Sequence, residues 1–143
     1  MTKSKLFFDT NIFLDFFLAD RSIQKPYIDQ IFHHAFQNDL EGGFADFSLI
    51  NLNYFLKQRY KVEKKDAEQY LQIILDRFEV VAPTKKQLQI GFNMAWKDYE
   101  DCIQFLIAQS WGADFIITSN VKDFRLSNVL VYTPKQFATK YLN

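Results

Sequence analysis

Three short stretches of the chain place carboxylate and amide side chains beside segments that form regular structure. Asp9 ends a short apolar run, and three carboxylates fall within residues 98–101. Asn120 and Asp123 follow a second apolar run at residues 115–117. Hard oxygen ligands of this kind suit Mg²⁺, which keeps several waters and takes only one or two protein carboxylates. If the fold brings the three stretches together, the bound metal can activate a water and stabilise negative charge on a phosphodiester.

Each stretch also has an ordinary structural interpretation when it is taken alone. An Asp that precedes Thr-Asn, as Asp9 does, often caps the next helix. Asp98, Glu100 and Asp101 can be acids of a first helical turn, where the helix dipole favours negative charge. Residues 118–120 can be simple turn residues. Because all three stretches lie at a strand end or a helix start, a joint site at one sheet edge is favoured over three separate caps.

Short apolar runs alternate with helical stretches along the whole chain. We expect strands at residues 5–9, 44–47, 78–82, 115–118 and 129–132. Helices are expected at residues 12–17, 22–40, 48–56, 67–75, 84–95, 98–111 and from residue 134 onward. Gly42 and Gly43 are expected to end the second helix, Ser48 to cap the third, and Gly112 to end the helix before the fourth strand. This alternation favours an α/β fold, with a parallel sheet covered by helices on both faces.

Length and composition limit the class of protein. With 143 residues the chain suits one domain with a real core, so a single domain over residues 1–143 is expected. The 17 basic and 17 acidic residues cancel, which removes the argument for a nucleic-acid partner that a strongly basic domain would give. The single cysteine, Cys102, excludes an intrachain disulfide and fits a reducing compartment. No apolar run reaches membrane-spanning length and no secretory signal is present, so a cytoplasmic protein is expected.

The three stretches, in their order along the chain, resemble the PIN-domain family of metal-dependent ribonucleases. The resemblance rests on residues 7–12, on residues 98–101 leading to Ala108, and on residues 116–124. It implies a three-layer sandwich with a five-stranded parallel sheet in the order 3-2-1-4-5. In that order strands 1 and 4 are neighbours, so Asp9 and Asn120 would meet at the topological switch point, where such sheets bind their ligands.

The resemblance also implies roles for individual residues. Asp9 and Asp101 are similar to metal-binding carboxylates, and Asn11 and Thr118 to residues that orient such ligands. Either Asn120 or Asp123 could supply the last contact to the metal. The residues expected at the site are therefore, as catalytic groups, Asp9, Asp101, Asn120 and Asp123; around Mg²⁺ or Mn²⁺, Asp9, Asp98, Asp101 and Asn120; and in support, Asn11, Asn51, Glu100 and Thr118.

One position departs from the family pattern. The family commonly has a Glu on the helix after the second strand, whereas residues 48–56 contain no acid and Asn51 stands at the corresponding place. An amide oxygen can bind magnesium but brings no charge. Asp46, Asp98 or Glu100 would have to compensate for the missing carboxylate.

The activity implied by the resemblance is hydrolysis of RNA by a water activated on the metal. Candidates for binding the phosphate backbone are Lys57, Arg59, Lys61, Lys64, Lys65, Lys122 and Arg125, although short charged runs are more often plain solvated surface. Many PIN domains are VapC-type toxins whose antitoxin inserts a segment over the site, so an antitoxin partner is implied. The 16 Phe and 7 Tyr also make an exposed apolar patch, and hence a homodimer, plausible.

Two other functions stay open at this point. A haloacid-dehalogenase-like phosphatase also places a nucleophilic Asp at the end of its first strand, but it needs a second Asp where Asn11 stands. A PIN-like module that binds without catalysing is the other alternative, because the missing acid at Asn51 can indicate a lost site.

Overall fold

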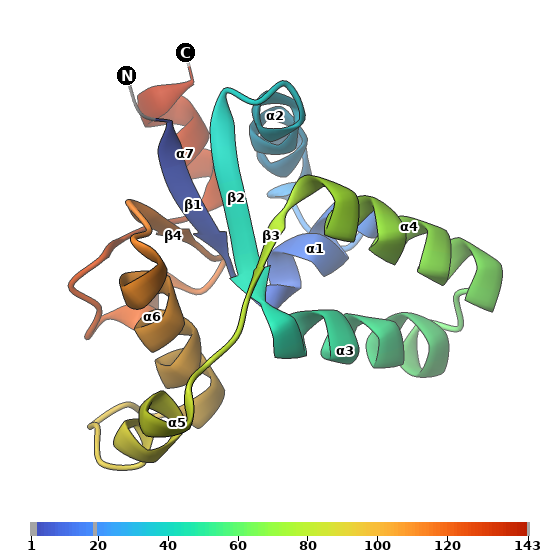
Figure 1. Cartoon of the computed structure of the whole chain (residues 1–143). Coiled ribbons are helices and arrows are strands. Elements are labelled where there is room, and N and C mark those ends of the chain that lie inside the picture. The colour runs from blue at the N-terminus through green and yellow to red at the C-terminus, as the bar shows by residue number, and fades with distance from the viewer. Residues whose placement is uncertain (1–2, 19, 143) are drawn as a thin grey trace.

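The computed structural model describes residues 3–18 and 20–142. Its strands form a single parallel sheet in the order β3-β2-β1-β4-β5 (Figure 1), which confirms the expected fold class and strand order. Strand β1 lies at the centre of the sheet, between β2 and β4. The strand bounds are β1 Ser4–Phe8, β2 Leu40–Ala45, β3 Glu79–Val81, β4 Phe115–Ile117 and β5 Leu130–Tyr132.

Helices cover both faces of the sheet, with α6 on one side and α1 and α2 on the other (Figure 1). Successive side chains of a strand point to opposite faces, so Leu6 and Phe8 enter one core and Phe7 enters the other. The first core also receives side chains from α1, α2, α3, α4 and α7, and the second from α6 and η2. The helix bounds are α1 Thr10–Phe17, α2 Lys25–Phe36, α3 Asp46–Tyr54, the π-helical turn η1 Phe55–Arg59, α4 Lys64–Arg77, α5 Lys85–Gly91, α6 Tyr99–Trp111, the short 3₁₀ helix η2 Val121–Phe124 and α7 Pro134–Tyr141.

Several helix ends lie where the sequence places them. Thr84 and Thr133 each cap the next helix, and in both cases a Gln three residues later bonds back to the cap. Gly112 ends α6 with φ of 86°, a left-handed conformation that glycine adopts without strain. These caps fix the entry of α5 and α7 and the turn from α6 into β4.

The assignment of Gly42 and Gly43 as a helix end is wrong. Both lie inside β2, and α2 ends earlier because Asn38 takes a left-handed φ of 63°. A Cβ added at Gly42 would collide with the ring of Phe78, and one at Gly43 would lie 2.8 Å from the ring of Trp111. These glycines let aromatic rings pack directly on both faces of the sheet.

Other predicted bounds also shift. The helix expected to start at Ser48 begins at Asp46, so Ser48 is internal and its buried hydroxyl lies 2.5 Å from Oγ1 of Thr10. The helix that Thr84 caps ends at Gly91 rather than at residue 95, and residues 92–98 form a turn that leads into α6. Within residues 3–18 and 20–142, no helix is long and apolar enough to cross a membrane.

Candidate active site

The site lies at the carboxyl edge of the sheet, between its two central strands. Phe8 of β1 is in register with Ile117 of β4, and the backbone N–H of Asp9 donates to the carbonyl oxygen of Ile117 over 3.0 Å. Asp9 and Thr118 therefore lie side by side, each directly after the end of its strand. The chain turns to opposite sides of the sheet at this point, which is the switch point where α/β folds bind ligands.

A cleft of about 280 Å³ opens at this edge. The three stretches singled out in the sequence converge there, and α3 contributes from the far side of the cleft. Among the expected site residues, those that line the cleft are Asp9, Asn11, Asn51, Asp98, Glu100, Asp101, Asn120 and Asp123. Thr118 is fully buried beneath them.

Asp9 is the buried acid of the cleft, with only 6% of its surface exposed. Its side chain does not cap α1. Instead, Oγ1 of Thr118 donates to Oδ2 over 2.9 Å, and Nε2 of Gln104 donates to Oδ1 over 3.2 Å. Burial raises the pKa of Asp9 and outweighs these two hydrogen bonds, which act to lower it. Its carboxylate is thus fixed in orientation and short of positive charge.

Gln104 is a site residue that the sequence analysis missed. It is buried, its amide nitrogen bonds to Asp9, and its Oε1 has no hydrogen-bond partner within the described residues. The available signal was spacing: Gln104 follows Asp101 by three positions, so both side chains share one face of α6. In an otherwise apolar helical stripe, a single glutamine does not by itself indicate a functional site.

The acids at the start of α6 combine capping with mutual repulsion. Oδ1 of Asp98 accepts from the backbone N–H of Asp101 over 2.9 Å, so the ordinary helix-cap interpretation holds for that oxygen. Burial, and then the charges of Asp9 and Asp98, raise the pKa of Asp101 from 3.8 to about 7. Burial and the same two charges also raise the pKa of Glu100. Repulsion of this kind is relieved when a cation joins the carboxylates.

Asn51 faces the acids from the opposite wall of the cleft. Its Nδ2 donates to Oε1 of Glu100 over 3.3 Å, which joins α3 to the first turn of α6. Asp46 is not among the described residues that line the cleft, and its Oδ1 accepts from the backbone N–H of Phe47 over 2.7 Å. Of the acids named as substitutes for a charge at Asn51, Glu100 is the one in contact with it.

The donor set matches a magnesium-type cation. Within the described part of the chain, no three His, Cys, Asp or Glu side chains meet closely enough to hold a metal by themselves. Mg²⁺ does not need such a cage, because it keeps several waters and is held by one or two carboxylates. Asp9 and Asp101 repel each other across the cleft and are both short of counter-charge, so they are the pair best suited to share a cation.

Comparison with known proteins identifies the fold family. A model of the PIN domain matches residues 5–122. The chain belongs to the PIN-domain family. This favours the PIN interpretation of Asp9 over the haloacid-dehalogenase alternative.

Relatives and solved structures resemble this PIN domain along nearly their whole length. Ribonuclease VapC1 from Aquifex aeolicus (strain VF5) is 24% identical over 146 residues, which cover 99% of this chain and 98% of the relative. The crystal structure of VapBC2 from Rickettsia felis, bound to a DNA fragment from their promoter, aligns with a TM-score of 0.64 and 15% identity over 90% of this chain and 98% of that chain. A toxin–antitoxin complex from Klebsiella pneumoniae aligns with a TM-score of 0.64 and 22% identity, over 90% of this chain and 97% of that chain. At these identities the structural matches establish the fold alone.

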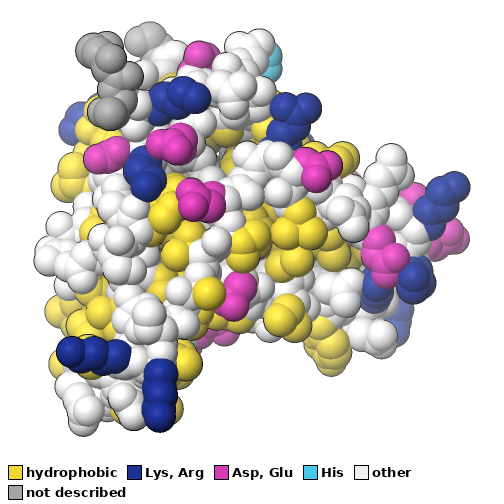
Figure 2. All heavy atoms as spheres, in the orientation of Figure 1, with side chains coloured by type: hydrophobic (Ala, Val, Ile, Leu, Met, Phe, Trp, Pro, Cys, Tyr) yellow, Lys and Arg dark blue, Asp and Glu magenta, His cyan; other side chains and the backbone are white. Residues whose placement is uncertain are grey.

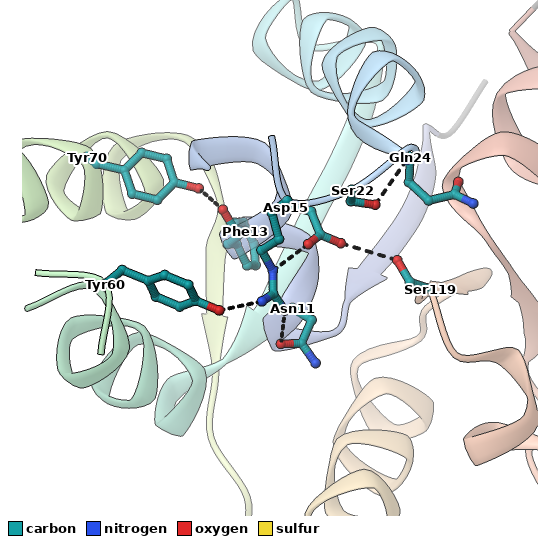
Figure 3. Close-up of polar contacts among 9 residues, drawn as sticks. Asn11, Phe13, Asp15, Ser22, Gln24, Tyr60, Tyr70 and Ser119 are labelled. Carbon is teal, nitrogen blue, oxygen red and sulfur yellow. Dashed lines mark hydrogen bonds and ion pairs between the residues drawn. The ribbon is translucent and has the colours of Figure 1, made fainter. Parts of the chain in front are cut away.

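Within the described residues, the side chain of Asn11 makes no hydrogen bond to Asp9 or Asp101, although it lines the same cleft of this PIN domain. Its Oδ1 accepts from Nη2 of Arg21 over 3.2 Å, while Nε of Arg21 pairs with Oδ1 of Asp15 at 2.6 Å (Figure 3). Nη1 of Arg21 donates to the hydroxyl of Tyr60 over 2.6 Å, and Ser119 donates to the other oxygen of Asp15 over 3.4 Å. Since an arginine can only donate, the amide nitrogen of Asn11 is left free to serve as a donor in the cleft.

The predicted RNA-binding residues separate into two groups in the PIN domain. Lys57 and Lys64 are both paired with Glu68, at 2.6 and 3.0 Å. Figure 2 shows basic and acidic side chains mixed at this end of the molecule, where η1 follows α3 and α4 begins. Lys122 and Arg125 instead lie beside the cleft, around a hollow that Asp123 also lines.

Proposed function

We propose that this PIN domain is a metal-dependent ribonuclease that hydrolyses RNA phosphodiester bonds with Mg²⁺ or Mn²⁺ bound at Asp9 and Asp101. The observation that carries the proposal is the convergence of five carboxylates in one cleft at the switch point: Asp9, Asp98, Glu100, Asp101 and Asp123. Burial and the neighbouring charges raise the pKa of Asp101, which supports the proposal. Clustered carboxylates whose neighbours raise their pKa values are typical of functional sites. The name of the Aquifex relative, a ribonuclease, supports the choice of reaction.

The side chains divide the work as their contacts suggest. Thr118 and Gln104 hold the Asp9 carboxylate in one orientation by donating to its two oxygens. Asn120 and Asp123 also line the cleft, where either side chain would contact the metal or a water bound to it. When bound, the metal supplies a water of lowered pKa and positive charge opposite the phosphate oxygens.

Glu100 takes the part of the acid that Asn51 lacks. The hydrogen bond between Asn51 and Glu100 holds a carboxylate from α6 against the wall formed by α3. The charge of the cleft is thereby maintained from a different helix. Replacing Glu100 by Gln should therefore weaken Mn²⁺ binding, and Asn51→Asp should strengthen it.

A protein partner completes the proposal. The Klebsiella structure is a toxin–antitoxin complex, and the Rickettsia structure is the VapBC2 complex. We infer that this chain is the toxin of such a pair and that its partner is an antitoxin which covers the cleft. The partner's chemistry would have to suit an acidic cleft bordered by cations.

A cleavage assay with purified chain tests the proposal. End-labelled single-stranded RNA is incubated with Mg²⁺, Mn²⁺ or EDTA and with wild type, Asp9→Asn or Asp66→Asn. Asp66 is an exposed acid in the first turn of α4, outside the cleft, and serves as the matched control. Because loss of a partner that merely orients a metal ligand costs about 10–100-fold, loss of Asp9 should cost at least about 100-fold.

The outcomes separate the alternatives. Metal-dependent cleavage that Asp66→Asn retains and Asp9→Asn loses supports the proposal. Equal degradation by wild type and Asp9→Asn assigns the activity to a contaminant and refutes it. If wild type binds Mn²⁺ in calorimetry but cleaves no RNA, the protein is a binding module that does not catalyse.

A further inference from the structure

A hollow of about 660 Å³ lies beside the acidic cleft and differs from it in charge. Its lining comes from the turn between α5 and α6 and from the η2 region, and includes Trp96, Lys97, Lys122, Asp123 and Arg125. Three of these side chains are cations and one is an acid. We call this pocket the basic hollow. Its volume falls within the range of about 300–1,000 Å³ in which small-ligand pockets lie.

The cations of the basic hollow are not neutralised by the protein. Within residues 3–18 and 20–142, the side chains of Lys97, Lys122 and Arg125 form no ion pair or hydrogen bond, and all three residues are exposed. Lys57 and Lys64, in contrast, share Glu68. Unpaired cations that face one concavity attract anions, because low-dielectric walls concentrate their field.

One wall of the hollow is formed by the ring of Trp96, which is held in place by two neighbouring aromatic rings. Trp96 is half-buried and stacks on Phe105, with ring centroids 5.1 Å apart and an interplanar angle of 20°. It also meets Phe124 edge to face at 5.8 Å. A ring fixed in this way offers its remaining surface to a ligand without losing further conformational freedom.

The basic hollow adjoins the acidic cleft. Asp123 lines both, and Lys97 also borders a smaller pocket with Asp98 and Asp101. A chain molecule bound in the cleft would therefore need to extend only past Asp123 to reach the hollow.

We propose that the basic hollow binds a nucleotide adjacent to the cleaved bond of single-stranded RNA. Lys97, Lys122 and Arg125 would contact its phosphates, and Trp96 its base or sugar. Cations combined with an aromatic surface are typical of single-strand binding, in which phosphates provide electrostatic affinity and bases stack on rings. An acidic peptide could use the cations but would gain less from the ring. This inference rests on the proposed ribonuclease function.

Anisotropy of a fluorescein-labelled six-nucleotide oligouridylate tests the assignment. The measurement uses Asp9→Asn protein, so that the RNA stays intact, at several KCl concentrations. Into this background Lys97→Gln, Lys122→Gln and Arg125→Gln are introduced singly. The matched control is Lys3→Gln, because Lys3 is exposed and directly precedes β1, at the edge of the sheet opposite the cleft. Each change in the hollow should raise Kd about 3–10-fold and reduce the salt slope by about 0.7, the value for one single-strand phosphate contact. The control should leave Kd within about twofold.

Tryptophan fluorescence provides a second measurement. Oligouridylate should quench the emission of wild-type protein in EDTA, and Trp96→Phe, which leaves Trp111 as the remaining tryptophan, should abolish the quench. A quench that persists in Trp96→Phe would place the RNA elsewhere.

Each result decides one of two questions. If Lys3→Gln weakens binding as much as the three changes in the hollow, or if those three have no effect, the hollow is not the RNA site, whether or not the wild type cleaves RNA. If the hollow variants weaken binding but wild type cleaves nothing, the hollow is an RNA-binding site, and both the ribonuclease proposal and the position next to a cleaved bond are refuted. If a labelled six-residue oligoaspartate binds more tightly than the RNA and depends on the same cations, the hollow is a protein-docking site and the RNA assignment is wrong.

Discussion

Replacing Asp101 by Asn should stabilise the metal-free protein at about pH 8, even though it removes a proposed metal ligand. The amide has nearly the same shape as the carboxylate, and the Asp101 side chain has no hydrogen-bond partner among the described residues. Burial, followed by the charges of Asp9, Asp98, Asp123 and Glu100, raises the pKa of Asp101 from 3.8 to about 7. The ionised carboxylate therefore opposes folding.

The pH range follows from the sign of this pKa shift. Between pH 3.8 and about 7 the unfolded chain loses the proton while the folded chain keeps it, so the group lowers stability increasingly as pH rises. Above about pH 7 the penalty is complete, and a shift of roughly three units corresponds to ~4 kcal/mol. Because Asp101 is only half-buried, screening by water and salt reduces this to ~2 kcal/mol. At ~2–4 °C per kcal/mol for a domain of this size, Tm should rise by ~4–8 °C.

Thermal unfolding followed by circular dichroism, in EDTA and across pH values from about 4 to 8, measures the effect. The stabilisation by Asp101→Asn should be largest at the alkaline end and vanish near pH 4. Asp66→Asn, at the exposed first turn of α4, should change stability by less than ~0.5 kcal/mol at every pH. The reasoning is refuted if Asp101→Asn melts at or below the wild-type temperature at pH 8, or if its gain does not depend on pH.

Three further predictions concern the same site and the sheet behind it. Mn²⁺ must displace the proton of Asp101, so the affinity of the protein for Mn²⁺, measured by calorimetry, should fall up to about tenfold for each pH unit below 7. An affinity that does not depend on pH would mean that Asp101 is not a ligand. Arg21→Gln leaves the buried Asp15 without its cation and should lower the free energy of unfolding in urea by ~3 kcal/mol, with part recovered in the double variant that adds Asp15→Asn. Gly42→Ala forces a methyl group into the ring of Phe78 and should cost ~1–3 kcal/mol in the same assay, whereas a neutral result would mean that β2 can shift.

The parts of the site that the sequence predicted depend on local pattern and topology. Asp9 and Asn120 each follow an apolar strand, and the parallel order places those two strand ends side by side. The acids of residues 98–101 reach the same edge because the turn before α6 delivers the helix start there. Such features do not depend on how the side chains pack, since they follow from where strands end and helices begin.

The parts that the sequence did not predict depend on contacts between layers. Gln104 matters because its amide reaches Asp9 across the interface between α6 and the sheet, which no local pattern reveals. Gly42 and Gly43 stop a helix in most sequences, but here rings from both sides require the absence of a Cβ. Asn11 was expected to orient a metal ligand, and only the position of Arg21 shows which of its atoms is occupied.

The equal numbers of acids and bases in the sequence conceal a separation of charge in the fold. Acids are gathered in the cleft, whereas Lys97, Lys122 and Arg125, in the adjacent hollow, have no ion-pair partner in the part of the chain that the structure describes. Glu68 neutralises part of the basic segment 57–65. A polyanion is therefore attracted to the hollow and repelled from the cleft until a divalent cation offsets the acids. Metal and RNA should then bind cooperatively, each tightening the other by the same factor, because the two binding free energies are linked. A neutral composition thus excludes a uniformly basic surface, but it does not exclude a nucleic-acid partner.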